Sequence, residues 1–322
     1  MTLDPVELGS FWMPRQSSTI ASEIDFAWYV VYYLDVIMFF GLMIPMFYFI
    51  RRFARRTDND KVSAITHSTK LEIGWTVIPS ILVIALFFVG LRGYLMAAVA
   101  PANAYEIRAT AEMYMWTFTY PNGNVTVNEL VVPKDKPVKL IMSSKDVLHS
   151  FYVPEFRVKQ DVIPGTYTTI WFEANAKRET VLFCTEYCGV GHSEMMAKVY
   201  SVEQPEWEQF LDTGEAPSGE KAPKDLKPEE LGKKYFTKFS CNTCHSLDGT
   251  RVQGPSFKGV FGKTETFADG SSAVVDENYI RESLLEPQKK IVQGYPGTMP
   301  TFKGTMKDKQ IDALIAFIKS VK

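Results

Sequence analysis

The chain has 322 residues, which is too long for one ordinary domain and suits two or three domains of about a hundred residues each. Its formal net charge of −2, with no basic stripe after the first hundred residues, argues against a nucleic-acid binder. The four cysteines form two short-spaced pairs, Cys184/Cys188 and Cys241/Cys244, and this pattern indicates metal or cofactor attachment more than a distributed disulfide framework.

Residues 1–104 contain two long apolar runs. Each run, at about residues 26–50 and 75–100, is long enough to cross a bilayer core of roughly 30 Å. The basic cluster Arg51-Arg52-Phe53-Ala54-Arg55-Arg56 lies between them, and basic loops favour the cytoplasmic side. We therefore expect a transmembrane hairpin with the N-terminus and everything after residue 100 on the outer, periplasmic face of a bacterial plasma membrane. Residues 1–24 lack a basic start and a cleavage signature, so a removable signal peptide is not expected.

Residues 105–202 change to short runs of alternating apolar and polar residues, such as Val138-Lys139-Leu140-Ile141-Met142. Turn signals separate the runs, among them Pro121-Asn122-Gly123 and Pro164-Gly165. This pattern predicts an antiparallel β-sandwich or barrel.

A dozen residues of this region hold four side chains that bind soft or borderline metals: Cys184, Cys188, His192 and Met195. Such ligands favour copper, zinc or iron over magnesium or calcium. For the two cysteines alone, three interpretations stay open: a local disulfide, a zinc site completed by His192 and one further ligand, or a copper site.

Residues 203–227 are rich in Glu, Pro, Lys, Gly and Ser and are predicted to be a linker. A compact segment, residues 228–322, follows it. The segment opens with a helical pattern from Pro228 to Phe239 and closes with another from Lys307 to Val321.

The second cysteine pair lies in Cys241-Asn242-Thr243-Cys244-His245, the sequence form of c-type haem attachment. The two thiols can form thioethers to the haem, and His245 can then bind the iron. A sixth ligand that raises the potential is methionine. Met299 lies in a loop that Pro300 holds extended, whereas Met306 lies at the start of the last helix, so Met299 is favoured. A thioredoxin-like redox disulfide would require a βαβ context, which is missing here. A zinc site would require a second cysteine pair nearby, which is also missing.

Residues 228–322 resemble an all-α class I cytochrome c domain. Gly254-Pro255 is similar to that family's loop beneath the haem, and Gly232 with Phe236 is similar to the residues by which its terminal helices cross.

The loop from Cys184 to Met195, together with His149 and the membrane hairpin, resembles subunit II of the haem-copper oxidases, in which a cupredoxin-like sandwich carries a dinuclear copper (CuA) centre. From about residue 10 to its end, the chain resembles the variant with its own cytochrome c. The resemblance implies that both cysteines bridge two coppers and that two histidines cap them. It also implies weak ligands from Met195 and from the backbone carbonyl of Glu186.

Other positions carry roles that only the resemblance implies. The Glu186 side chain corresponds to a ligand of magnesium at the contact with subunit I, and Asp146 and Asp161 fall where the family has acidic residues. Glu72 corresponds to a carboxylate at a proton-channel entrance. Two aromatic residues align with the segment beside the copper, namely Tyr114, where many members have tryptophan, and Trp116.

The resemblance implies an electron-transfer subunit of a terminal cytochrome c oxidase, in contact with subunit I and subunit III. Its external donor would be a cytochrome c or an upstream respiratory complex, and oxygen reduction coupled to proton translocation would take place in another subunit. Two alternatives stay open: the corresponding subunit of a copper-containing nitric oxide reductase, and a free-standing membrane-tethered electron carrier. A structural zinc module is a more distant one.

Overall fold

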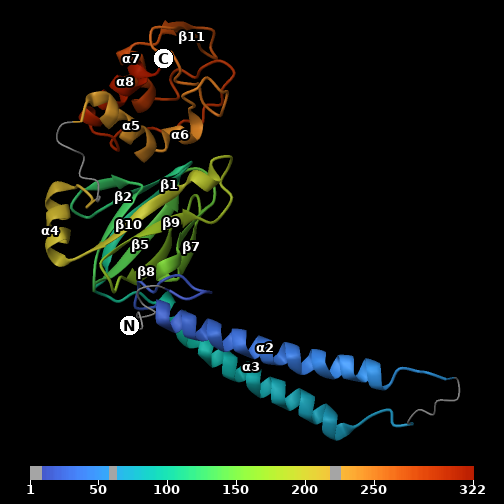
Figure 1. The fold of residues 1–322 in the computed structure, drawn as a ribbon. Helices are drawn as coiled ribbons and strands as arrows, with labels where there is room; N and C mark the ends of the chain where they lie inside the picture. Colours follow the sequence, from blue (N-terminus) through green and yellow to red (C-terminus); the bar gives the residue numbers. More distant parts are fainter. Residues whose placement is uncertain (1–8, 58–63, 218–225) are drawn as a thin grey trace. The chain divides into compact units, whose positions relative to one another are not determined.

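The computed structural model describes residues 9–57, 64–217 and 226–322 (Figure 1). The chain divides into two compact units. The first comprises the chain up to Val99 apart from Ser17–Thr19, and the second comprises Ser17–Thr19 with Ala100–Lys322.

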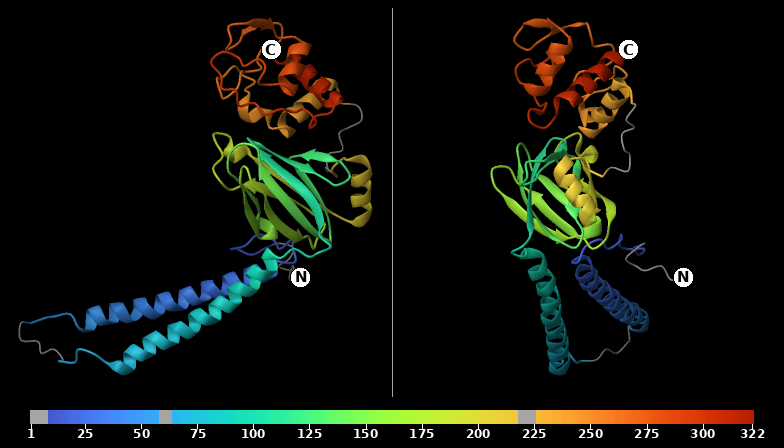
Figure 2. Two further views of the ribbon diagram at one scale, coloured as in Figure 1. Left: turned by 180° about the vertical axis from the view of Figure 1, so that it is seen from behind. Right: turned by 90° about the vertical axis from the view of Figure 1, so that its left-hand side faces the viewer.

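The first unit consists of two long apolar helices, α2 (Ala21–Arg52) and α3 (Thr69–Ala98). Both are long and apolar enough to cross a membrane, by length and composition. Their central side chains are exposed, as lipid-facing side chains would be. The helices lie close together where Arg92 binds Glu23 at 2.9 Å, and they diverge toward the loop that joins them (Figure 2). Both helices are longer at their starts than the predicted runs of residues 26–50 and 75–100.

The first domain of the second unit is a sandwich of two five-stranded sheets. One sheet has the order β3-β2-β1-β5-β8 and the other the order β4-β10-β9-β6-β7. The strands are β1 (Tyr105–Glu112), β2 (Met115–Thr119), β3 (Val125–Val127), β4 (Glu129–Pro133), β5 (Pro137–Ser144), β6 (His149–Val153), β7 (Val158–Val162), β8 (Thr168–Glu173), β9 (Arg178–Cys184) and β10 (Met196–Val202).

The predicted β-sandwich is confirmed, but its sheets are mixed and not wholly antiparallel. Strand β1 pairs with β5 and strand β10 pairs with β4 in parallel. A parallel pair cannot be closed by a tight hairpin, so the chain must leave the sheet between the two partners. Between β1 and β5 the chain forms β2 and β3 of the same sheet and then β4 of the other, and between β4 and β10 it passes through strands of both sheets.

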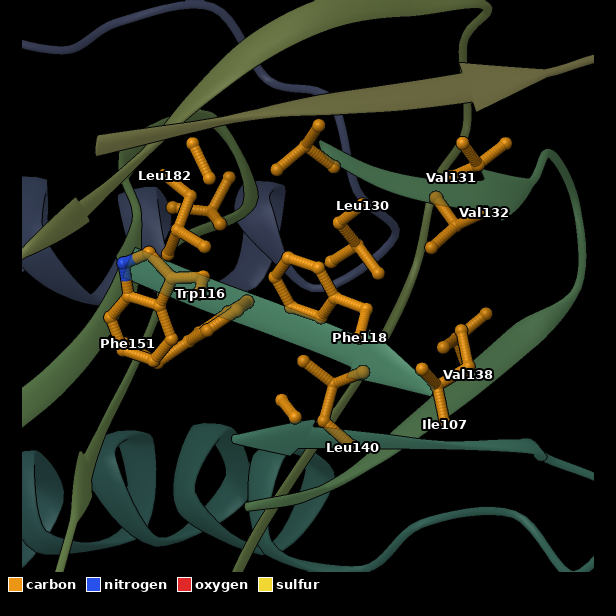
Figure 3. Packing of buried hydrophobic residues seen from close by; sticks show 14 of the residues in the cluster. Ile107, Trp116, Phe118, Leu130, Val131, Val132, Val138, Leu140, Phe151 and Leu182 are labelled. Carbon is orange, nitrogen blue, oxygen red and sulfur yellow. The ribbon is translucent and has the colours of Figure 1, made fainter. Parts of the chain in front are cut away.

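Apolar side chains from both sheets fill the sandwich. Along β5, Val138, Leu140 and Met142 are buried while the residues between them are partly exposed, as the period of two requires. Figure 3 shows Phe151 and Leu182 beside Trp116 in this core. Fully burying an aliphatic or aromatic side chain contributes about 1.5–3 kcal/mol relative to exposure. This packing gives the loops at the ends of the strands a rigid support.

Helix α4 (Gln204–Thr213) occupies the start of the stretch predicted as a linker, so that prediction was wrong for this part of residues 203–227. Trp207 and Phe210 are buried in the sandwich core, and the Phe210 ring lies 4.8 Å from that of Tyr120. The surrounding polar residues hide this short apolar face in the sequence. Residues 218–225 of the predicted linker lie outside the described residues.

The second domain contains helices α5 (Pro228–Lys238), α6 (Cys241–Cys244), α7 (Glu277–Leu285) and α8 (Asp308–Ser320). The predicted crossing of its terminal helices is confirmed, since a Cβ on Gly232 would lie 2.0 Å from the Ala313 carbonyl oxygen and the rings of Phe236 and Phe317 are 5.4 Å apart. A small antiparallel pair, β11 (Thr264–Thr266) with β12 (Ser272–Val274), adds strands to a domain expected to be all-α.

Candidate metal centre and haem site

The first site lies at one end of the second sheet. Cys184 is the last residue of β9, and His149 is the first of the neighbouring strand β6. The loop from β9 to β10 carries the other candidate metal ligands. The hydrogen bond from Cys184 N–H to the Met195 carbonyl, at 3.2 Å, joins its two ends. Thr185 N–H also donates to the Ser150 carbonyl at 3.0 Å, so both strands hold the loop.

Two sulfurs form the centre of the site. The Sγ atoms of Cys184 and Cys188 are 3.8 Å apart, and each has its own histidine. Nδ1 of His149 lies 3.8 Å from the Cys184 sulfur, and Nδ1 of His192 lies 3.5 Å from the Cys188 sulfur. Their further neighbours are the Met195 thioether sulfur, 3.8 Å from Cys188, and the Glu186 carbonyl oxygen, 3.3 Å from Cys184.

These donors fit a metal that accepts thiolate, imidazole and thioether ligands. The ligand atoms of His149, Cys184 and Cys188 all lie within 4.8 Å of one another, and all three residues are buried. Met195 is also fully buried. Among the three metals left open by the loop alone, copper accepts this whole donor set, including the thioether.

The two thiols of the site, those of Cys184 and Cys188, differ in pKa. The hydrogen bond between the two thiols is the largest influence on Cys184 and lowers the pKa of that thiol. The same hydrogen bond raises the pKa of Cys188, because its proton is shared with the neighbouring thiolate. Burial lowers the pKa of His149, but hydrogen bonds to Asp146 and Cys184 outweigh it and raise that pKa to about 9.

Asp146 fixes the orientation of His149. Its Oδ1 atom lies 2.8 Å from His149 Nε2, and its Oδ2 atom accepts from Met113 N–H at 2.7 Å. With Nε2 held in this way, Nδ1 faces the sulfur of Cys184. A carboxylate on the far nitrogen is the usual support for a histidine that binds a metal.

The second site lies in the cytochrome-like domain, where a cavity is lined by Cys241, Cys244, His245 and Met299. The His245 ring stacks on Phe257 at 4.5 Å, and its Nδ1 atom donates to the Pro255 carbonyl at 2.7 Å. Burial lowers the pKa of His245, which keeps the imidazole neutral. Nε2 is then the nitrogen with a free lone pair, as an axial ligand of haem iron requires. The cavity residues therefore fit a covalently attached haem.

Comparison with known proteins gives three family matches along the chain. Residues 5–92 match the transmembrane domain of cytochrome c oxidase subunit II, residues 122–202 match its periplasmic domain, and residues 229–322 match cytochrome c. Cytochrome c oxidase subunit 2 of Alkalihalophilus pseudofirmus is 31% identical over 285 residues, which cover 86% of this chain and 80% of the relative.

The chain belongs to the cytochrome c oxidase subunit 2 family.

The chain is also similar to a second family member and to one solved structure. Cytochrome c oxidase subunit 2 of Bacillus subtilis is 27% identical over 300 residues, covering 86% of this chain and 82% of the relative. The periplasmic domain of subunit II of cytochrome oxidase of Bradyrhizobium japonicum is 28% identical, with a TM-score of 0.35 over 36% of this chain and 96% of that domain.

As a cytochrome c oxidase subunit 2 with a C-terminal cytochrome c domain, the chain supports electron transfer in a haem-copper oxidase. Its family implies a copper centre, and its C-terminal domain implies haem. Its family also implies association with subunit I and with an electron donor.

The structure brings the two aromatic candidates to the loop from Cys184 to Met195, called the copper loop below. The side chain of Tyr114 is buried, and a Cβ on Gly189 or Gly191 would lie 2.6 Å from atoms of this side chain. Trp116 is fully buried, and its ring centroid lies 6.3 Å from that of His149. Glu72 lies elsewhere, in the first turn of α3 in the other unit.

Several functional contacts could not be found from motifs. Gln253 accepts a hydrogen bond from Tyr114 at 3.3 Å, although 139 residues separate them. Phe257 supports the haem histidine without belonging to the attachment motif. The sequence indicates that the Gly254-Pro255 loop lies beneath the haem. Only the structure shows that the Pro255 carbonyl accepts the hydrogen bond from His245.

Proposed function

We propose that this chain relays electrons from an external donor, through a covalent haem c and a dinuclear copper centre, to the oxygen-reducing site of subunit I. The observation that carries the proposal is the paired geometry of the copper loop. Two sulfurs 3.8 Å apart, each beside one imidazole, provide two equivalent halves of a site. A single zinc ion would be satisfied by the two cysteines and the two histidines, and it would leave the adjacent Met195 thioether without a role.

In this proposal, the two cysteines, Cys184 and Cys188, and the two histidines, His149 and His192, would hold the two copper ions. Met195 and the Glu186 carbonyl are the weak ligands. When bound, the copper pair would accept and donate one electron. The chain holds the ligands in place through the two strands, Asp146 and the buried surroundings, which limits rearrangement during transfer.

Cys241 and Cys244 would attach the haem, and His245 would bind its iron. Met299 is proposed as the second axial ligand, because it lines the cavity whereas Met306 does not and is buried in the domain core. The hydrogen bond from Gln288 to the Met299 carbonyl, at 3.3 Å, helps to hold the loop.

The remaining assignments concern placement and partners. We propose that the copper and cytochrome domains lie on the periplasmic side, because the arginine cluster at the end of α2 favours a cytoplasmic loop. Glu186 is half-buried beside the copper loop and is proposed as a magnesium ligand at the contact with subunit I. A contact with subunit III, proton translocation by the complex and a role of Glu72 at a proton channel belong to the same proposal.

The test is a spectrum of the purified complex together with its turnover. We expect the absorption bands of c-type haem and of dinuclear copper, two copper ions per chain in addition to the copper of subunit I, and oxygen consumption. Zinc without copper in residues 105–202 would contradict the copper assignment. Nitric oxide turnover in place of oxygen consumption would identify the complex as a nitric oxide reductase.

A further inference from the structure

We propose that the cytochrome domain docks on the copper domain through an interface built around Asn128, Glu129 and Lys238, and that electrons pass to the copper loop from this docked state. The proposal rests on the proposed function above, in which the haem of the same chain supplies electrons to the copper centre, and it adds the residues through which the two domains meet. Both domains belong to the second compact unit.

A half-buried ion pair joins the two domains. Lys238 Nζ lies 2.6 Å from Glu129 Oε2, and the two side chains are 33% and 14% exposed. Lys238 is the last residue of α5, just before the haem-attachment motif, and Glu129 is the first residue of β4. Partial burial makes this pair stronger than an exposed one, because solvent screens it less.

Asn128 adds hydrogen bonds beside the ion pair. Its Nδ2 atom donates to the Lys238 carbonyl at 2.9 Å and to Ser240 Oγ at 3.0 Å. Its Oδ1 atom accepts from Trp116 N–H at 2.8 Å, so one amide side chain connects the copper domain's core strand to the turn before Cys241. Asn128 adopts a left-handed backbone with φ of 53°, a conformation that asparagine tolerates well.

Apolar burial accompanies these polar contacts. Met115 and Val127, on the adjacent strands β2 and β3, are each only 2% exposed. They belong to the hydrophobic cluster of the cytochrome domain, together with Phe236 and Phe239, and not to the core of their own sandwich. Strand β3 is the edge of its sheet, and edge strands are commonly covered in this way.

The interface brings the haem-attachment turn to the copper loop. Gly191 precedes the candidate ligand His192, and a Cβ on Gly191 would lie 2.2 Å from the Thr243 methyl group. Thr243 lies between the two haem-attaching cysteines. Tyr114, which packs against Gly191, also donates a hydrogen bond to Gln253 of the cytochrome domain. The two cofactor sites are therefore separated by a few side chains in van der Waals contact.

The charges of the two domains support the same pairing. Acidic residues outnumber basic ones in residues 100–217, whereas Lys and Arg outnumber Asp and Glu in residues 228–322. Opposite net charges favour encounter and orientation of the two surfaces, and salt weakens this effect.

The test reverses the central ion pair in the complete, solubilised oxidase. Lys238→Glu places two carboxylates together and should lower the rate of electron transfer from haem c to copper about ten-fold at low ionic strength, measured after flash reduction. Glu129→Lys should act similarly. The double variant should recover most of the rate. Lys319→Glu is the matched control, because Lys319 also pairs with a carboxylate at 2.6 Å but within the cytochrome domain.

A second measurement tests the interface without relying on electron transfer. Lys238→Glu should accelerate amide hydrogen exchange in residues 125–130, which lie across the interface, while Lys319→Glu should not. Unchanged exchange there would overturn the docking interface. An unchanged transfer rate, or an equal fall in the Lys319→Glu control, would overturn its role in electron transfer. Failure of the proposed function would differ from both, since the unmodified chain would then lack the copper or haem bands.

Discussion

At the scale of single residues, the Cys188 sulfur is the point where most of the copper loop converges. It contacts the sulfur of Cys184, Nδ1 of His192 and the thioether of Met195, all within 3.8 Å. A hydroxyl at this position is smaller and is a poor ligand for a soft metal. Substitution of Cys188 therefore distinguishes a dinuclear copper site from a loop whose cysteines bind no metal.

Cys188→Ser should abolish the mixed-valence copper absorption while leaving the haem spectrum intact. The haem residues lie in another domain, so loss of a copper ligand should leave the haem attachment in place. Absorption and electron paramagnetic resonance spectra of the purified complex measure both centres in one sample. Ser193→Ala, an exposed position of the same loop, is the control and should keep both signals. Persistence of the copper bands in Cys188→Ser would show that the site is assigned incorrectly.

Met299 and Met306 differ in their surroundings, which predicts different effects of the same substitution. Met299→Ala should change the axial ligation of the haem and lower its potential, because methionine ligation raises the potential. Met306→Ala should leave ligation unchanged but destabilise the domain by about 2–5 kcal/mol, as truncation of a buried side chain does. Redox titration and thermal unfolding of both variants make the comparison. A ligation change in Met306→Ala alone would reassign the ligand.

A site residue could be predicted when it lies close in the sequence to the other residues of its site. The loop from Cys184 to Met195 and the motif from Cys241 to His245 are local, so spacing alone indicated metal and haem chemistry. His149 joined the site only through the family resemblance, since it comes from a different strand. The contact between Asn128 and Lys238 spans 110 residues and depends on the packing of two domains, which no local pattern records.

At the scale of elements, the apolar runs predicted both long helices, and the alternating runs predicted the sandwich. Sequence periodicity did not indicate which strands pair in parallel, because the side-chain pattern of β1 and β5 is the same for either direction. Helix α4 was missed because only Trp207 and Phe210 of its residues are buried. The crossing of α5 and α8 was predicted from the family resemblance of Gly232 and Phe236, and the glycine permits the close approach that the structure shows.

Gly232→Ala tests this crossing. The added Cβ would lie 2.0 Å from the Ala313 carbonyl oxygen and 2.6 Å from Phe317 Cβ, so the helices would have to separate. We expect the cytochrome domain to lose about 1–3 kcal/mol of stability, the usual cost of overpacking, in spite of the higher helix propensity of alanine. Thermal unfolding followed through the haem absorption measures the change. Lys233→Ala, on the exposed side of α5, should have little effect; a similar loss there would indicate a cause other than the crossing.

At the scale of the whole molecule, the two cofactor sites belong to one chain, and the tether raises their effective concentration. Short flexible linkers commonly give effective concentrations in the millimolar range. The docking interface of Lys238 and Glu129 can therefore be modest in strength and still be occupied most of the time. Fusion of the cytochrome domain thus removes the need for a strong binding surface.

Cutting the chain after Pro217 should slow electron delivery to the copper loop, because the cytochrome domain would then bind as a separate protein. A protease site inserted there allows the uncut and cut forms of one preparation to be compared. We expect the rate from haem c to copper to fall at least ten-fold at micromolar protein and to recover as added cytochrome domain approaches millimolar concentration. Uncut protein carrying the same insertion is the control for the insertion itself. An unchanged rate after cutting would mean that the interface holds the domains together without the tether, and the combination of the cut with Lys238→Glu would then separate the two contributions.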